Sequence, residues 1–126
     1  MVKKMEWKFV IHNEEKYLEV VTSGIVDGDG TIDMAQAIAQ TMRSNRLTKA
    51  LIDHRNVVKV TSSTYATYNR PKILRLIGLT LGIRLAELVR PEDEFHFKFF
   101  ETVCFNQGYK LSVFYEKDQA LAWLLH

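Results

Sequence analysis

The sequence predicts a single α/β domain with a mixed sheet of about five strands, covered by about four helices. Two observations predict the class: the chain opens with two β-rich runs, and it then alternates strand-like and helix-like segments. A third sets the size, because 126 residues with 47% hydrophobic content suffice for one core but not for two domains. The expected order is β-β-α-β-α-β-α-β-α, mostly parallel after the first strand, with right-handed crossovers.

The first third of the sequence predicts a hairpin followed by a helix. Residues 5–11 and 17–25 are rich in β-branched and aromatic side chains, and a polar loop separates them. Apolar side chains then recur near helical spacing over residues 32–47. An amphipathic helix is therefore expected there, with Asp29 or Thr31 as its cap.

The middle of the chain reads as strand, loop and helix. The apolar run within residues 49–54 predicts a central strand that ends where polar side chains emerge. Hydroxyl groups in Thr61-Ser62-Ser63-Thr64 can accept hydrogen bonds from the free N–H groups of a helix's first turn, so a helix should begin there. Pro71 should break or kink that helix, and a second helical segment is expected from this proline.

The last third predicts two strands and two helices. Residues 83–89 end in apolar side chains and are expected to form a strand. Pro91, the acidic residues after it, and Gly108 supply the start and stop signals of one helix. A strand over residues 109–115 and a closing helix over residues 119–125 complete the domain.

Composition argues against export and against membrane insertion. The longest apolar stretch, residues 73–89, is interrupted by charged side chains and falls short of the roughly 20 apolar residues of a membrane span. The N-terminal residues lack the apolar region and cleavage site of a signal peptide, so a cytoplasmic location is expected. Cys104 is the only cysteine, which rules out an intramolecular disulfide and a cysteine-rich zinc site, and its apolar neighbours favour a buried thiol.

The common catalytic and cofactor motifs are absent from the sequence. Gly28-Asp29-Gly30 is half of a dinucleotide-binding fingerprint and reads as a turn, and the four histidines lack metal-binding spacing. A Ser–His–Asp set at the central strand fails because Asp53 and His54 are adjacent, and adjacent strand side chains point to opposite faces. We therefore expect no cofactor, no metal and no enzymatic activity.

Basic residues are concentrated in the middle of the chain. Between Arg43 and Arg90, ten lysines and arginines stand against two acidic residues, whereas the whole chain has a net charge of +2. An anionic partner for this region is one interpretation, and charge dispersed over the solvated surface is the other. Asp53, His54 and Arg55, at the end of the central strand, either present charged groups to a ligand or anchor a loop.

Aromatic residues gather in the helix expected after Pro91. Its phenylalanines exceed what one buried helical face needs, so part of the set is a candidate lining for a groove or a partner interface. The set is Phe95, Phe97, Phe99, Phe100 and Phe105.

Several segments together resemble the small bacterial SpoIIAA-like proteins, which belong to the STAS and Sec14-like (CRAL-TRIO-like) group. The segments are Leu51-Ile52-Asp53-His54-Arg55-Asn56-Val57, Phe99-Phe100-Glu101-Thr102-Val103, Asn106-Gln107-Gly108-Tyr109, Val113-Phe114-Tyr115 and Ala120-Leu121-Ala122-Trp123-Leu124. The resemblance covers nearly the whole chain and implies one STAS-like domain over residues 1–126. Such a domain is expected to regulate by binding a protein partner and not by catalysis.

The STAS side of the resemblance implies a phosphorylation switch. Anti-sigma factor antagonists of this group carry an Asp-Ser-Ser-Gly segment at the start of the helix after the central strand, and Thr61-Ser62-Ser63-Thr64 occupies that place. Ser62 or Ser63 is then the candidate phosphorylation site, although threonines replace the flanking Asp and Gly. A phosphate would add about −1.5 to −2 charge at a helix N-terminus near Arg55. Helix capping is the alternative role of both serines.

The Sec14-like side implies instead an anionic, lipid-like amphiphile held between helices and sheet, with peripheral membrane contact. Tyr65, Tyr68 and the apolar side chains within residues 73–77 would suit such a ligand, and they would equally suit a core helix. A protein partner is our main expectation and the amphiphile is the alternative. No nucleic acid is expected, and a homodimer is compatible with both. The candidate surface comprises Asp53, His54, Arg55, Tyr65, Tyr68, Arg70 and Arg75.

Overall fold

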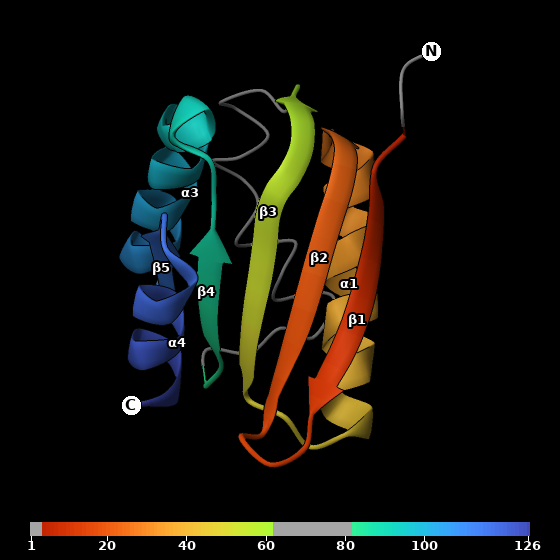
Figure 1. Ribbon diagram of the computed structural model, residues 1–126, viewed down its shortest axis with the longest axis vertical. Coiled ribbons are helices and arrows are strands. Elements are labelled where there is room, and N and C mark those ends of the chain that lie inside the picture. Colours follow the sequence, from red (N-terminus) through yellow and green to blue (C-terminus); the bar gives the residue numbers. More distant parts are fainter. Residues whose placement is uncertain (1–3, 62–81) are drawn as a thin grey trace.

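A computed structural model describes residues 4–61 and 82–126 and has the expected α/β architecture with one mixed sheet (Figure 1). Five strands lie side by side in the order β1-β2-β3-β4-β5. β1 is antiparallel to β2, and the other neighbouring pairs are parallel, which confirms the predicted hairpin and the mostly parallel sheet. The bounds are β1 Glu6–His12, β2 Tyr17–Val26, β3 Lys49–Val60, β4 Arg84–Leu88 and β5 Lys110–Phe114.

β3 is longer than the sequence predicts. The expected end at His54 is wrong, because β3 stays paired with β2 as far as Val60 by absorbing two shifts in register. Each shift is a β-bulge, in which one strand carries an extra residue. The first bulge is at His54 and Arg55, and the second is at Val58. The register steps from Val21–Asp53 to Ser23–Asn56, and from Gly24–Val57 to Ile25–Lys59.

The part of the chain that the structure describes contains three α-helices, and the helical segment expected within residues 62–81 lies outside it. The helices are α1 Gly28–Ser44, α3 Glu94–Asn106 and α4 Lys117–Leu125, and a 3-10 turn, η1 Pro91–Asp93, precedes α3. Gly108, with φ of 88°, follows the C-cap of α3 as the sequence predicts.

α1 begins earlier than the sequence predicts. Its cap is Asp27, whose side chain accepts a hydrogen bond from Gly30 N–H at 2.6 Å. Neither Asp29 nor Thr31 is the cap, and Gly28-Asp29-Gly30 is the first turn of the helix instead of a separate turn. The physical reason is that Asp27 follows the last residue of β2 directly, in an extended conformation from which its carboxylate reaches the free N–H groups.

The helices divide between the two faces of the sheet. On one face, Ile38 of α1 and Phe100 of α3 share a large buried cluster with Ile52 of β3. On the other face, Leu124 of α4 packs in a smaller cluster with Leu51, the neighbour of Ile52. Because side chains alternate along a strand, each β3 residue faces either α1 and α3 or α4. We call these the α1/α3 face and the α4 face.

α3 has both a buried and an exposed aromatic side. Phe97 and Phe100 lie in the core, whereas the side chains of Phe95 and Phe105 are 80% and 75% exposed. Cys104 is buried, as its neighbours predict. None of the helices described here is long and apolar enough to cross a membrane.

Candidate functional site

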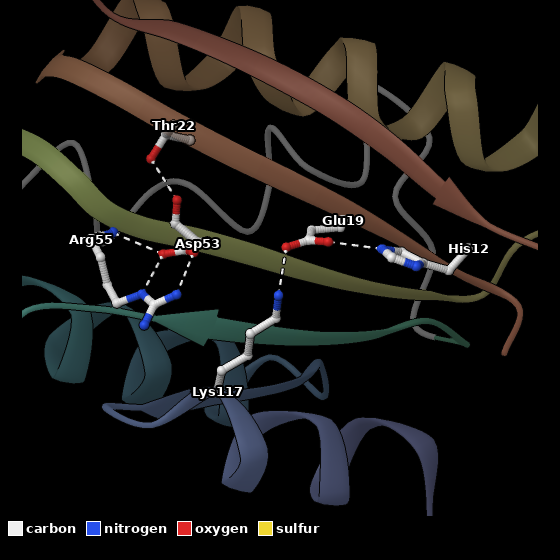
Figure 2. Close-up of polar contacts among 6 residues, drawn as sticks. All are labelled: His12, Glu19, Thr22, Asp53, Arg55 and Lys117. Carbon is white, nitrogen blue, oxygen red and sulfur yellow. Dashed lines mark hydrogen bonds and ion pairs between the residues drawn. The ribbon is translucent and has the colours of Figure 1, made fainter.

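Three of the sequence-predicted site residues lie in the described part of the chain, all on β3. Asp53 and Arg55 point to the α4 face (Figure 2). His54 points to the opposite face and stacks on Phe97 of α3. The alternation that excluded a Ser–His–Asp set from Asp53 and His54 is therefore present in the strand. The other candidates, Ser62, Ser63, Tyr65, Tyr68, Arg70 and Arg75, lie outside the described residues.

Asp53 and Arg55 form a two-pronged ion pair across the first bulge. Arg55 Nε donates to Asp53 Oδ1 and Arg55 Nη2 to Asp53 Oδ2, both at 3.0 Å. The backbone N–H of Arg55 also donates to Asp53 Oδ1 at 3.0 Å. An extra residue at a bulge leaves a backbone group without its partner in the ladder, and here the carboxylate supplies that partner. One side chain thus stabilises the bulge and fixes the guanidinium above it.

The electrostatics of this pair keep both groups ionised. Burial by itself would raise the pKa of Asp53, but the hydrogen bonds from the Arg55 side chain and backbone outweigh burial and lower it. The side-chain hydrogen bonds to Asp53 raise the pKa of Arg55. Asp53 accepts hydrogen bonds from Nε and Nη2 of Arg55, whose side chain is 46% exposed, so the remaining N–H groups of the guanidinium can donate to another acceptor.

A second polar cluster lies on the α4 face beside the first (Figure 2). Glu19 of β2 contacts His12 Nε2 at 2.8 Å and Lys117 Nζ of α4 at 3.1 Å. Burial would raise the pKa of Glu19, but the hydrogen bonds from His12 and Lys117 lower it overall. His12 also stacks on Tyr17, with ring centroids 4.3 Å apart. This cluster ties α4 to the hairpin across the sheet.

His54 is the centre of a buried polar chain on the α1/α3 face that crosses three neighbouring strands. Its Nδ1 lies 2.7 Å from Thr22 Oγ1 of β2, and its Nε2 lies 2.6 Å from Glu87 Oε2 of β4. Relative exposure is 0% for Thr22, 3% for His54 and 5% for Glu87. Burying polar groups this deeply costs free energy unless each has a hydrogen-bonding partner. Here each of the three side chains has one.

Two arrangements of protons satisfy the hydrogen bonds among Thr22, His54 and Glu87, and the second arrangement holds one proton more than the first. In the first, Thr22 donates its hydroxyl proton to His54 Nδ1, and neutral His54 donates Nε2–H to the Glu87 carboxylate. In the second, Thr22 donates to the backbone oxygen of Asp53, 3.2 Å away, and His54 Nδ1–H donates to Thr22. A further proton is then shared between His54 Nε2 and Glu87.

A hydroxyl, an imidazole and a carboxylate in a row match the groups of a nucleophilic triad, but this position does not suit catalysis. Thr22 is fully buried in the middle of the sheet, beneath the α1/α3 layer, where no substrate atom can approach its hydroxyl. The hydrogen bonds from His54 instead link β2, β3 and β4 at the first bulge. Sequence reasoning missed Thr22 and Glu87. The available signal was a polar residue inside an otherwise apolar strand, which must find a partner when the strand is buried.

The second bulge exposes an apolar side chain at the end of β3. Val58 is 65% exposed, and its backbone oxygen accepts a hydrogen bond from Arg90 Nη2 at 3.4 Å. Arg90 is itself held by Asp93 at 2.9 Å. β4 pairs with β3 only as far as Asp53, so beyond that residue no described strand pairs with this side of β3. Within residues 4–61 and 82–126, no group of three or more His, Cys, Asp or Glu side chains could hold a metal ion.

Comparison with known proteins identifies the fold. No protein-family model matches the chain, and no curated protein matches its sequence. Among solved structures, an uncharacterized protein from Shewanella loihica PV-4 with a SpoIIAA-like fold is similar, with a TM-score of 0.57 at 18% identity over 95% of this chain and 93% of that one. An anti-sigma factor antagonist from Mycobacterium paratuberculosis is also similar, with a TM-score of 0.64 at 15% identity over 96% of this chain and 94% of that one. The chain therefore has a SpoIIAA-like fold, as the sequence resemblance implies, and neither structure supports the Sec14-like part of that resemblance.

Proposed function

We propose that the protein is a non-enzymatic regulatory domain that binds a protein partner through the region 53–75, of which residues 53–61 are described. The likeness to an anti-sigma factor antagonist supports a regulatory role. The observation that carries the proposal is the exposed second half of β3, where an apolar side chain, Val58, lies among polar ones at a bulged strand. In the sequence, Ser62 and Ser63, the predicted phosphorylation sites, follow shortly after the end of β3.

The second half of β3 has the composition of a small protein-binding surface. Val58 is flanked by the exposed side chains of Arg55, Asn56 and Lys59. An apolar or aromatic anchor ringed by polar groups is the usual arrangement of an interface hot spot, since the ring excludes water once the partner is bound. The positive charge of Lys59 and the free edge of the Arg55 guanidinium favour a partner with acidic groups at matching positions.

Hydrogen bonds within the protein also order this surface before any partner arrives. The Asp53 carboxylate fixes the first bulge through three hydrogen bonds, and Arg90 fixes the second through the backbone oxygen of Val58. A surface that is already ordered loses less entropy when it binds, so a small contact area can still give useful affinity. The bulges thus serve binding by aiming Val58 outward and by keeping it there.

The lipid-like alternative stays a prediction. It needs an apolar cavity covered by the segment 61–81, of which all but Thr61 lies outside the described residues. No specific feature of the described part favours it over a protein partner.

Site-specific photo-crosslinking tests the proposal. A photo-reactive amino acid is placed at position 58, or at position 10 as the matched control, because Val10 is a second exposed valine, 49% exposed, on the outer strand β1. Each variant is irradiated in cells that produce the protein, and the partner is identified by mass spectrometry. We expect a partner crosslinked from position 58 and not from position 10.

Binding of the identified partner is then titrated with purified variants. Val58→Asp should weaken binding by about tenfold or more, because it places a charge at the apolar centre of the contact, whereas Val10→Asp should leave affinity unchanged. Equal crosslinking from both positions, or equal affinity of Val58→Asp and Val10→Asp, would exclude this surface. Circular dichroism of both variants checks that they are folded.

A further inference from the structure

A groove with a volume of about 780 Å³ runs over the outer edge of β5, far along the sheet order from the exposed valine of β3. α3 lines one side with Lys98 and Phe105, and α4 lines the other with Trp123. Figure 1 shows β5 at one end of the sheet, with α3 and α4 next to it. Because the lining comes from both faces of the sheet, the floor of the groove is the edge of β5 itself.

In the part of the chain that the structure describes, the backbone of β5 presents an unpaired N–H and C=O to this groove. Phe114 C=O accepts from Val89 N–H at 2.9 Å on the β4 side, whereas Val113 N–H donates to Glu101 Oε2 at 2.6 Å on the outer side. Successive residues of a parallel strand direct their N–H and C=O groups to opposite sides, so Leu111 points outward with Val113. Glu101 occupies Val113 N–H. Leu111 N–H and C=O therefore lie on the open edge, where no described strand pairs with them.

The charge around the groove is positive. Arg84 and Lys110 form no ion pair with any acid of residues 4–61 and 82–126, and Lys98 contacts Glu101 at 3.5 Å. The Arg84 guanidinium lies over the Trp123 ring, 4.4 Å from the centroid, and its Nε is buried without a hydrogen-bond partner in the described structure. A guanidinium that is fixed on an aromatic ring and lacks a carboxylate attracts an acidic group.

The two sides of the groove differ in chemistry: one carries cationic side chains and the other an apolar ring. Lys110 shares the α4 face with Phe114, which packs against Trp123, so the cations Arg84 and Lys110 lie on that side. On the α3 side, the 75% exposed ring of Phe105 offers an apolar contact. A strand added to this edge would direct alternate side chains to the two sides.

We propose that the β5 edge is a docking site for a short extended peptide segment of a partner protein in which acidic and apolar residues alternate. The segment pairs its backbone with Leu111, its acidic side chains face Arg84 and Lys110, and its apolar side chains contact Phe105. Pairing ends at Val113, whose N–H is occupied by Glu101, so the docked strand is short. This site is separate from the exposed end of β3, and either surface can exist without the other.

A display library of random 12-residue peptides, panned on the full-length protein, tests the proposal. Enriched sequences should alternate acidic and apolar residues, and a synthetic copy of one should bind in solution. Lys110→Glu should weaken its affinity about tenfold, whereas Lys8→Glu, an exposed lysine on the opposite edge strand β1, should not. Phe105→Ser should weaken binding, whereas Phe95→Ser, an equally exposed phenylalanine of the same helix outside the groove, should not.

Amide hydrogen exchange gives a readout that depends on the backbone pairing. In the free protein, the Leu111 amide should exchange faster than the Ser112 amide, which points toward β4, and the peptide should slow Leu111 selectively. The proposal is overturned if no acidic peptide is enriched, if the peptide binds Lys110→Glu as well as wild type, or if Leu111 is not protected. Sedimentation equilibrium tests the alternative occupant, a second copy of this chain. A dimer that dissociates in Lys110→Glu would mean that the second copy, and not a partner's peptide, fills the groove.

Discussion

Replacing Glu87 by alanine should strongly lower the free energy of unfolding, because it breaks a buried pair. Glu87 Oε2 lies 2.6 Å from His54 Nε2, and both side chains are almost fully buried. Removing one partner of a buried pair costs about 3–5 kcal/mol, since the other is left without a partner or water. This is a large part of the roughly 5–15 kcal/mol that stabilises a typical domain. Glu87→Gln keeps a hydrogen-bonding group in place and should cost about 1–2 kcal/mol.

Equilibrium unfolding in urea, followed by the fluorescence of Trp7 and Trp123, measures this loss. With a slope of about 2 kcal/mol per molar urea, a loss of about 4 kcal/mol lowers the midpoint by about 2 M. The matched control is Glu92→Ala, which removes an exposed glutamate 3.8 Å from Arg90. An exposed ion pair of this kind contributes less than about 1 kcal/mol, so the control should stay close to wild type.

Two outcomes would refute the reasoning about the buried chain. One is a midpoint for Glu87→Ala that matches the Glu92→Ala control, because the Glu87 carboxylate would then not hold His54. The other is strict additivity between Thr22→Val and Glu87→Gln in a double-mutant cycle. These two residues share His54 as their partner, so their effects should couple by at least about 0.5 kcal/mol.

Three further predictions concern the ion pair, the cap of α1 and the turn after α3. Asp53→Asn should reduce the loss of stability at acid pH. The pKa of Asp53 lies below its ordinary value of 3.8. The ionised carboxylate therefore contributes to the free energy of unfolding above about pH 4, and this contribution is lost as the pH falls through the lowered pKa. Urea midpoints from about pH 2 to 6 measure this, and parallel profiles for variant and wild type would contradict it. Asp27→Ala removes the 2.6 Å hydrogen bond to Gly30 N–H and should cost about 0.5–2 kcal/mol in thermal unfolding, with most of it recovered in Asp27→Ser. Gly108→Ala forces a side chain into a backbone with φ of 88° and should cost about 1 kcal/mol, and an unchanged Tm would argue against that conformation.

Much of the fold is readable from local signals in the sequence. The polar loop between the first two strands, the proline that begins η1 and the glycine after α3 all stand where the sequence predicts them. These signals act within a few residues, because they depend on turn chemistry, on a missing N–H or on a positive φ. The cap of α1 was misassigned because several neighbouring residues could serve, and only the path of the backbone selects Asp27.

The site depends on contacts between distant residues, and those were not readable. The bulges of β3 arise from its pairing with β2, so the sequence of β3 alone suggests an end where polar residues appear. The partner of His54 is 33 residues away on β4, and nothing local connects the two. The sequence predicts Asp53 and Arg55 as polar residues at a strand end, whereas the hydrogen bonds between them depend on the bulge of β3.

The carboxylate of Glu101 has a consequence for how the folded chain behaves in a crowded solution. An outer strand with consecutive free backbone groups can recruit another molecule's outer strand, and sheets that grow in this way precipitate. Glu101 accepts a hydrogen bond from Val113 N–H and so interrupts the row of outward backbone groups of β5 next to Leu111. On the far side of the sheet, the exposed Glu6 and Lys8 of β1 interrupt the other row with charge. We therefore expect mutations of the charged side chains at the two borders of the sheet to change the solubility of the protein as well as the stability of its fold.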